Sequence, residues 1–187
     1  EADLPRLIFI NKMDRENADF YRTVEELQSK FSSRCIPLQL PIGTQDNFQG
    51  IVDLLTMKSY IGSPAEEAEI PSSLQNQANS FREKLIEAMA ETDDRLLMKY
   101  LEGEEISLEE LNDGLRQAVV TGRMVPVLVG SANQSIGITS LLDAASNYLP
   151  SPEEREVVIA GQGIKPSQDA PLAALVFKTS AAPYVGK

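Results

Sequence analysis

Two short apolar runs, each followed by a polar loop and an amphipathic helix, constrain the fold of this chain most. Residues 7–10 form the first run and residues 125–129 the second, and apolar residues then recur at helical spacing over 20–31 and 138–148. Continuous apolar runs of this length are typical of strands buried on both faces of a parallel sheet. Because crossovers between parallel strands are right-handed, the two units predict an α/β sheet flanked by helices.

The interval between the two units is too long to be a loop. Asp14 and Ser131, which follow the two strands, are 117 positions apart, whereas most loops between strands and helices contain about 2 to 6 residues. We therefore predict an inserted subdomain. Its first part, residues 38–61, contains short strand-like runs interrupted by proline and glycine.

Helices are predicted in the rest of the insert. Apolar residues recur at helical spacing over 74–89, and a shorter helix is expected over 94–101. A third helix should begin at Ser107 and Glu110, which have the spacing of a capping box. The insert is therefore predicted to be an α+β subdomain with three helices on a small sheet.

The chain changes character after residue 150. Residues 151–170 are rich in proline, glycine and acidic residues, which is typical of a linker, and a new strand is predicted over 172–179. The first residues lead almost directly into a buried strand, and the last ones are too few to complete a domain. We therefore expect a fragment of a longer protein.

Composition excludes several kinds of chemistry. Cys35 is the single cysteine and the chain has no histidine, so we expect no disulfide framework, no cysteine or histidine metal site and no histidine general base. The net charge of -11 argues against a broad nucleic-acid-binding face, because phosphate binding depends on Lys and Arg. No apolar run approaches the roughly 20 residues that cross a bilayer and no leader is recognised, so a membrane protein is not expected.

Most of the negative charge lies in the insert. Residues 62–123 contain 14 acidic and 6 basic residues. These charges can be solvated helix faces that keep a small subdomain soluble. The alternative is a docking surface for a basic partner, and a non-catalytic binding module is therefore a second hypothesis for the function.

The loop Asn11-Lys12-Met13-Asp14 follows the first strand, at the edge where open α/β sheets bind ligands. A carboxylate only accepts hydrogen bonds, and guanine offers it two adjacent donors, whereas adenine offers an acceptor at its ring nitrogen. Asp14 is therefore predicted to select guanine. Asn11 would hold the loop and contact the other edge of the base, and the aliphatic part of Lys12 would cover the ring.

The loop Gly130-Ser131-Ala132 follows the second strand and should lie at the same edge. The backbone N–H of Ala132 is predicted to donate to guanine O6. Either loop alone is compatible with an ordinary turn. Their order and their shared edge together favour a site for a guanine base.

Beyond these loops, the chain resembles the translational GTPases, and elongation factor G in particular. The resemblance covers essentially the whole chain in the family's order and approximate spacing. The further segments that carry it are Gln-Leu-Pro-Ile-Gly (39–43), Phe-Gln-Gly-Ile-Val-Asp (48–53), Lys-Tyr-Leu-Glu-Gly-Glu-Glu (99–105), Tyr-Leu-Pro-Ser-Pro (148–152), Pro-Leu-Ala-Ala-Leu-Val-Phe-Lys (171–178) and Pro-Tyr-Val-Gly-Lys (183–187).

The resemblance implies an incomplete P-loop-GTPase-type parallel sheet. Residues 1–36 and 122–150 would be its last two strand–helix units, and residues 37–121 the inserted subdomain. Residues 151–170 would be a linker, and residues 171–187 the start of a β-barrel domain.

The family's activity is also implied. The parent protein would be cytoplasmic, bind GTP or GDP with magnesium, hydrolyse GTP on the ribosome and drive translocation of tRNA and mRNA, and the insert would face the ribosomal stalk protein. Asn11, Lys12, Asp14, Ser131 and Ala132 match the guanine-contacting positions. Nothing matches Gly-x-x-x-x-Gly-Lys-Ser/Thr, so no catalytic residue or magnesium ligand is assigned. We expect those groups upstream in the parent, and expect this chain alone neither to hydrolyse GTP nor to bind it tightly.

Some positions depart from the family's pattern. Glu16-Asn17 stands where Thr-Gly is common, Asn133 replaces an apolar residue, and an expected Asp is absent before Pro183. A specialised paralogue, acting in ribosome recycling or ribosomal protection, therefore remains an alternative. A different GTPase with a similar sheet is a third, which the matches in the insert and tail disfavour.

Overall fold

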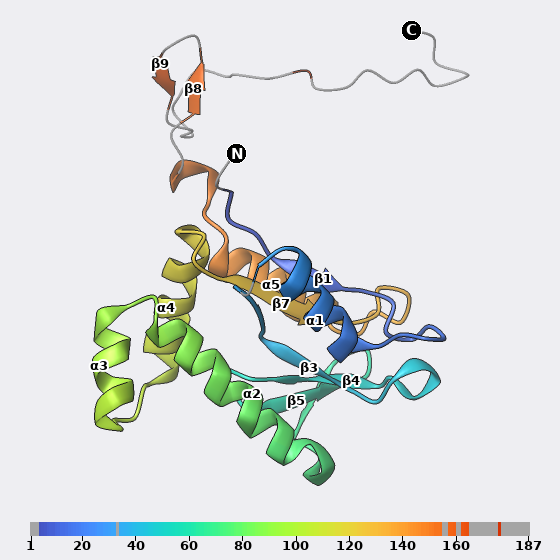
Figure 1. Ribbon diagram of the computed structural model, residues 1–187. Helices are drawn as coiled ribbons and strands as arrows, with labels where there is room; N and C mark the ends of the chain where they lie inside the picture. Colours follow the sequence, from blue (N-terminus) through green and yellow to red (C-terminus); the bar gives the residue numbers. More distant parts are fainter. Residues whose placement is uncertain (1–3, 33, 155–156, 160–161, 165–175, 177–187) are drawn as a thin grey trace, which may run out of the picture. The chain divides into compact units, whose positions relative to one another are not determined.

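The computed structural model describes residues 4–32, 34–154, 157–159, 162–164 and 176 (Figure 1). The chain divides into two units, residues 1–149 and 150–187, and each is described by itself. The elements of the first unit are β1 (Ile8–Ile10), α1 (Phe20–Lys30), β2 (Cys35–Pro37), β3 (Gln39–Ile42), the 3-10 turn η1 (Gln45–Asn47), β4 (Gly50–Asp53), β5 (Lys58–Ile61), β6 (Glu66–Ala68), α2 (Ser72–Ala90), α3 (Asp94–Glu102), α4 (Leu108–Val120), β7 (Val125–Val129) and α5 (Ile138–Tyr148).

A three-stranded parallel sheet carries the two predicted units. β7 lies in its centre, with Val127 opposite Ile8 of β1 and Val125 opposite Cys35 of β2. All five residues of β7 are buried, as expected for a strand covered on both faces. The predicted α/β fold class is therefore confirmed, and β2 is a third strand that we did not predict.

The two helices that follow β1 and β7 begin where predicted but bury slightly different faces. Asp19 caps α1 by accepting a hydrogen bond from the Arg22 N–H at 3.1 Å. Phe31 was expected on the buried face but is 76% exposed, because the helix ends at Lys30. In α5 the apolar spacing predicts one face with Leu141, Leu142, Ala145 and Tyr148, and for Leu142 this is wrong, since its side chain is 64% exposed while Ala144 is buried instead.

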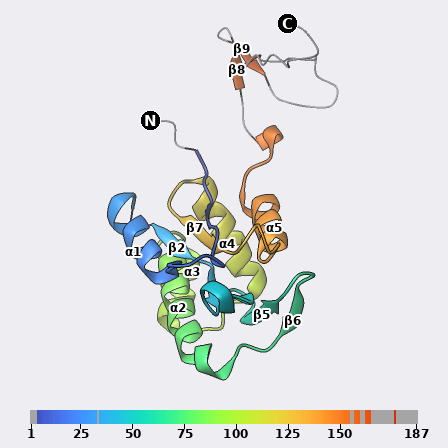
Figure 2. The same cartoon turned by 90° about the vertical axis from the view of Figure 1, so that its right-hand side faces the viewer.

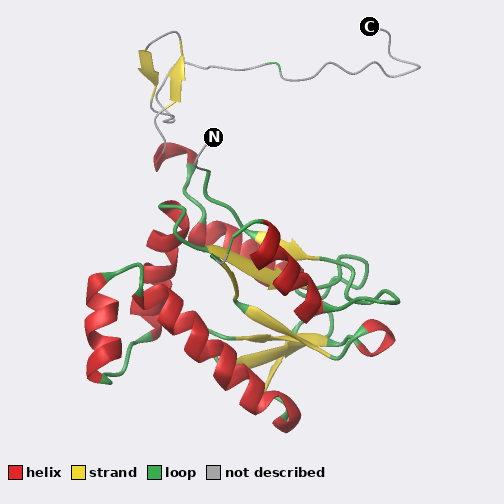
Figure 3. Ribbon diagram, in the orientation of Figure 1, coloured by secondary structure: helices red, strands yellow, loops and turns green. Residues whose placement is uncertain are grey.

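The insert is an antiparallel sheet with three helices, as predicted. Its strand order is β3-β4-β5-β6, and Figure 3 distinguishes these strands from the helices. α2 contacts α3 and α4, and the views in Figures 1 and 2 agree on this arrangement. The predicted capping box of α4 is confirmed, because Ser107 and Glu110 make both of its hydrogen bonds.

The insert is joined to the parallel sheet through backbone hydrogen bonds. The Leu38 N–H donates to the Val127 carbonyl at 2.9 Å, and the Leu54 N–H donates to the Leu38 carbonyl at 3.0 Å. Leu38 therefore links β7 to the antiparallel sheet. Buried apolar residues of both sheets and of α2 and α4 belong to one core cluster.

The second unit has little described structure. It contains a 3-10 turn, Pro152–Glu154, and the strands β8 (Val157–Ile159) and β9 (Gln162–Ile164), which pair antiparallel. This strand pair falls in the stretch that we predicted to be a linker. The strand predicted over 172–179 lies outside the described residues, apart from residue 176, and the domain boundaries stay predictions.

Candidate functional site

The loops after β1 and β7 meet at one edge of the parallel sheet, because the two strands are neighbours. The Gly130 N–H donates to the Ile10 carbonyl at 3.0 Å, and the Met13 N–H donates to the Gly130 carbonyl at 3.2 Å. A side chain at Gly130 would collide with the Ile136 carbonyl and the Phe9 ring. The absence of a side chain at Gly130 therefore lets the two loops approach closely.

Asp14 and Ser131, predicted from positions far apart in the sequence, are in direct contact. The Ser131 hydroxyl donates to Asp14 Oδ1 at 2.6 Å, and its oxygen accepts from the Gln134 N–H at 3.2 Å. Ser131 is fully buried and the Asp14 side chain is 8% exposed. This geometry fixes the carboxylate, whose Oδ2 lies 3.7 Å from the Arg15 side chain.

The charge of Asp14 is stabilised at this position. The hydrogen bond from Ser131 lowers the pKa of Asp14 below its ordinary value, against the opposing effect of partial burial, and the positive charge of Arg15 lowers it further. The group is therefore an ionised acceptor at neutral pH. Within the described part of the chain its Oδ2 has the 3.7 Å ion-pair contact with the exposed Arg15 side chain, and it can still accept a hydrogen bond from a ligand.

Asn11 ties the two loops together. Its Oδ1 accepts from the Lys12 N–H at 2.8 Å and from the Ala132 N–H at 2.9 Å. Two backbone donors at the oxygen fix the orientation of the amide, so its Nδ2 donors point elsewhere. The Ala132 N–H that we predicted to donate to guanine O6 is thus already hydrogen-bonded in this structure.

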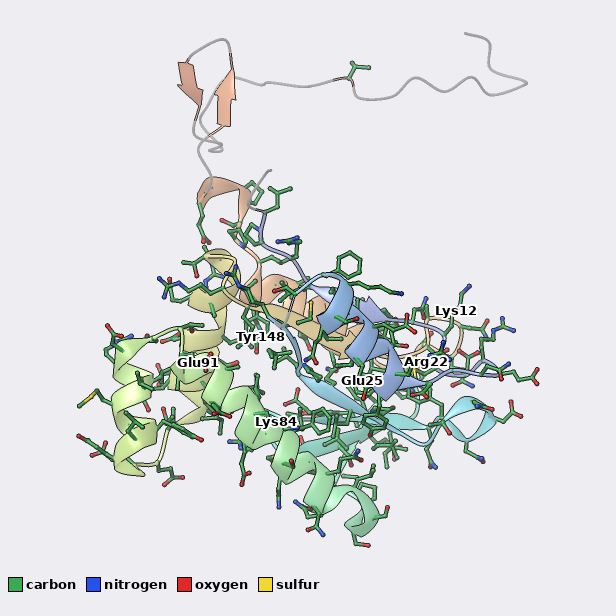
Figure 4. All side chains as sticks on the ribbon, in the orientation of Figure 1. Lys12, Arg22, Glu25, Lys84, Glu91 and Tyr148 are labelled. Carbon is green, nitrogen blue, oxygen red and sulfur yellow. The ribbon has the colours of Figure 1, made fainter. Side chains whose placement is uncertain are left out.

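Lys12 occupies an unusual backbone conformation. Its φ of 66° lies in the left-handed region, which few residues other than glycine adopt. Its side chain is exposed, and it lies at the start of the loop that follows β1, where Figure 4 labels it. The predicted contact of its aliphatic part with a base stays a prediction.

Sequence reasoning missed one support of this site. The Gln45 N–H of the turn η1 donates to the Met13 carbonyl at 2.9 Å, so the insert helps to hold the first loop. This is a backbone contact between residues 32 positions apart, and no side-chain pattern signals it. No group of three or more His, Cys, Asp or Glu residues able to hold a metal occurs in the described part of the chain.

Two comparisons with known proteins bear on this arrangement. Residues 1–151 match the protein family described as the elongation factor Tu GTP binding domain. The chain is also similar to the crystal structure of a protein from Thermus thermophilus, with 35% sequence identity and a TM-score of 0.73 over 81% of this chain and 23% of that one. The chain thus spans less than a quarter of the length of that protein. No helix in the described residues is long and apolar enough to span a membrane.

Proposed function

Because the chain belongs to the elongation factor Tu GTP binding domain family of translational GTPases, we propose that its loop edge binds the guanine base of GTP or GDP. The observation that carries this proposal is the 2.6 Å hydrogen bond between Ser131 and Asp14, which joins two loops 117 positions apart. It leaves a nearly buried carboxylate whose Oδ2 is paired only with the exposed Arg15 side chain, and such an acceptor suits the adjacent N1–H and amino donors of guanine.

The other loop residues have complementary roles in the proposal. The Nδ2 of Asn11 donates to the base at the edge opposite Asp14, and the exposed stem of Lys12 covers the ring. The Ala132 N–H is shared between Asn11 Oδ1 and guanine O6 once a base is bound. Adenine is rejected because it places an acceptor against the carboxylate of Asp14.

At the level of the whole protein, we propose a translation factor of the elongation factor G type. The resemblance of segments along the chain supports this, including 39–43 and 48–53, which lie on paired strands. The parent would hydrolyse GTP on ribosomes in the cytoplasm to move tRNA and mRNA. Residues of the parent outside this chain would supply the phosphate-binding groups and the magnesium ligands, so the chain alone would be inactive. A paralogue in ribosome recycling or protection is the alternative.

Substitution Asp14→Asn in the whole protein that carries this chain tests the base assignment. The amide keeps an oxygen that can accept from Ser131 but replaces the free acceptor by a donor. We expect GTP affinity to fall about a hundredfold or more, and xanthosine triphosphate, which has a carbonyl in place of the amino group, to bind better than GTP.

A matched control for this experiment is Asp46→Asn. Asp46 is an exposed residue of η1, the turn that contacts the same loop. This variant should keep the preference for GTP over ATP and xanthosine triphosphate. Guanine selectivity that survives Asp14→Asn would refute the proposed role of Asp14.

Exposed apolar and acidic residues of α3, α4 and the segment between them support docking as a second candidate function. Met98, Leu101 and Leu108 are exposed apolar residues of α3 and α4, and the acidic residues Glu104, Glu105 and Glu109 lie between or beside them in the chain. We call these six residues the α3–α4 surface. We propose that it binds a basic partner with apolar contact residues, and the family resemblance suggests the ribosomal stalk protein.

Salt dependence and charge reversal test this second function. Association with ribosomes should slow markedly between low and physiological salt if the acidic residues steer the partner. Reversal of Glu104, Glu105 and Glu109 to Lys should slow it further, whereas Glu110 must be kept because it forms the capping box. Reversal of Glu66, an exposed residue of β6, is the control. An on-rate unchanged by salt and by the triple reversal would reject the proposal.

A further inference from the structure

A cavity of about 400 Å³ lies between the antiparallel sheet of the insert and the helices α4 and α5. Its volume falls in the range of about 300 to 1,000 Å³ in which small ligands are bound. It shares no lining residue with the guanine loops. Its wall contains the polar side chains of Gln39, Asp53, Asn112, Asp143 and Tyr148.

Gln39 is a buried side chain with unused donors. It is 2% exposed, and its Oε1 accepts from the Val129 N–H at 3.3 Å, which fixes the orientation of the amide. Its Nε2 has no hydrogen-bond partner among the described residues. Because Gln39 lines the cavity and no fully buried polar side-chain atom in that part of the chain lacks a partner, we infer that Nε2 is the donor that Gln39 offers to the cavity.

Asp53 offers an acceptor to the same space. Its Oδ1 accepts from the Leu55 N–H at 2.9 Å, the Thr56 N–H at 2.8 Å and the Thr56 hydroxyl at 3.0 Å. Its Oδ2 makes no hydrogen bond within the described residues. The nearby Arg82 does not form an ion pair with it in the described structure and instead donates to the carbonyls of Leu54 and Leu55.

Tyr148 lines the same cavity as Asp53, and burial raises the pKa of the Asp53 carboxyl above its ordinary value. Burial raises the pKa of Tyr148 to about 12, and the negative charge of Asp53 contributes. The Tyr148 hydroxyl donates to Asn112 Oδ1 at 2.7 Å, so its oxygen can only accept from a ligand. Figure 4 marks Tyr148 on the ribbon, and Asp143 adds a second carboxylate to the wall from α5.

We propose that this cavity binds a guanidinium or ammonium cation that also carries a carbonyl or carboxylate oxygen, with arginine as the simplest example. The cation would contact the carboxylates of Asp53 and Asp143, and the oxygen would accept from Gln39 Nε2. A simple anion is disfavoured by the two carboxylates. An apolar ligand would leave Asp53 Oδ2 and Gln39 Nε2 without partners, which is costly in a buried site.

Either a free metabolite or an arginine side chain of a protein partner can supply this cation, and the experiment distinguishes the two. Free L-arginine represents a metabolite, and N-acetyl-L-arginine amide represents an arginine side chain of a protein partner. Each is titrated into the whole protein that carries this chain by calorimetry, with methyl NMR to locate the binding. The corresponding citrulline compounds are neutral analogues of nearly the same shape. Tighter binding of one arginine compound identifies the source, and the citrulline analogues should bind at least about tenfold more weakly.

Matched variants localise the site. In Asp53→Asn the amide oxygen can keep the three hydrogen bonds at Oδ1, while an NH₂ donor replaces Oδ2. The affinity for the arginine compound should therefore fall about tenfold or more. Asp143→Asn, at an exposed position of α5, should also weaken binding without disturbing the fold. Asp113→Asn, at an exposed position of α4 outside the cavity, should leave affinity unchanged.

The same titrations can overturn the proposal. No binding up to about 10 mM would do so, as would citrulline binding as well as arginine. An affinity that is unchanged in both Asp53→Asn and Asp143→Asn would place the ligand elsewhere. Guanine binding at the loop edge is measured separately, so its failure would not affect this result.

Discussion

At the scale of single residues, Ser131 controls the electrostatic state of Asp14. Its hydroxyl is buried, donates to the carboxylate and accepts from the Gln134 N–H, so its orientation is fixed by two partners. The hydrogen bond lowers the pKa of Asp14. This short hydrogen bond favours the charged form of the carboxylate and fixes its orientation. The carboxylate is therefore already positioned before a ligand binds.

Substitution Ser131→Ala should therefore raise the pKa of Asp14 towards its ordinary value of 3.8. A ¹³C NMR titration of the side-chain carboxyl measures this directly. Affinity for GDP should also fall about three- to tenfold, because the carboxylate is no longer held in place. Ser146→Ala, at an exposed position of α5, is the control. If the Ser131→Ala titration curve coincides with that of the unchanged protein, the hydroxyl does not set the charge of Asp14.

At the scale of elements, α4 owes its start to a combination of cap and ion pair. The Glu110 carboxylate accepts from the Ser107 N–H at 3.0 Å and from Lys99 Nζ of α3 at 2.6 Å. The Lys99 hydrogen bond, followed by those from Ser107, lowers the pKa of Glu110 from 4.5 to about 2. One side chain thus both caps α4 and connects it to α3.

Glu110→Gln tests the contribution of this charge, because glutamine can keep the capping box but cannot form the ion pair. Since the folded pKa lies below the unfolded one, the charge stabilises the fold above about pH 4.5, and this stabilisation is lost as the pH falls towards 2. The variant should be less stable than the unchanged protein at pH 7, with a difference that shrinks below pH 4.5. Urea unfolding at several pH values measures it.

Glu109→Gln provides the control for Glu110→Gln. It removes the same charge from the first turn of α4 at an exposed residue that forms no ion pair within the described structure. Its effect on stability should be small at every pH. If the difference in unfolding free energy between Glu110→Gln and the unchanged protein is the same at pH 7 and pH 3, the ion pair with Lys99 does not stabilise the fold.

Local signals explain which elements the sequence predicts well. Asp19 and the pair Ser107 and Glu110 are caps that act within a few residues, and β7 is a continuous apolar run, so their bounds follow from short segments. β2 has only three residues, and its place in the sheet depends on pairing with β7, 90 positions away at Cys35 and Val125. Apolar residues cover a wide arc of α5, so its buried face depends on its packing partners rather than on spacing.

In the candidate site, too, some features follow from local sequence signals and others depend on distant contacts. Asp14 and Ser131 could be predicted because each follows a recognisable strand, and the parallel sheet then brings them together. Two hydrogen bonds of the site could not be predicted, because their donors are backbone N–H groups, which every residue except proline has. They join the Ala132 N–H to Asn11 Oδ1 and the Gln45 N–H to the Met13 carbonyl. Side-chain identity thus indicates the chemistry of the edge, whereas the backbone determines which donors remain free.

At the scale of the whole molecule, the insert and the parallel sheet of residues 1–149 are physically continuous. Leu38 joins β7 to the antiparallel sheet through its N–H and its carbonyl, and Gln45 contacts the loop that holds Asp14. Leu85 of α2 and Val127 of β7 are both fully buried and belong to the same core cluster. We therefore expect the insert to unfold together with the sheet that carries the candidate site.

Leu85→Ala tests this coupling from inside the insert. The cavity that it creates should destabilise the protein by about 2 to 5 kcal/mol. If the insert and the sheet unfold as one unit, hydrogen exchange of the β7 amides should accelerate by the same factor as that of the α2 amides. Leu142→Ala, at an exposed position, should change neither. Faster exchange in α2 with unchanged protection in β7 would instead show that the insert opens independently, and that the contact of Gln45 with the Asp14 loop does not couple the two.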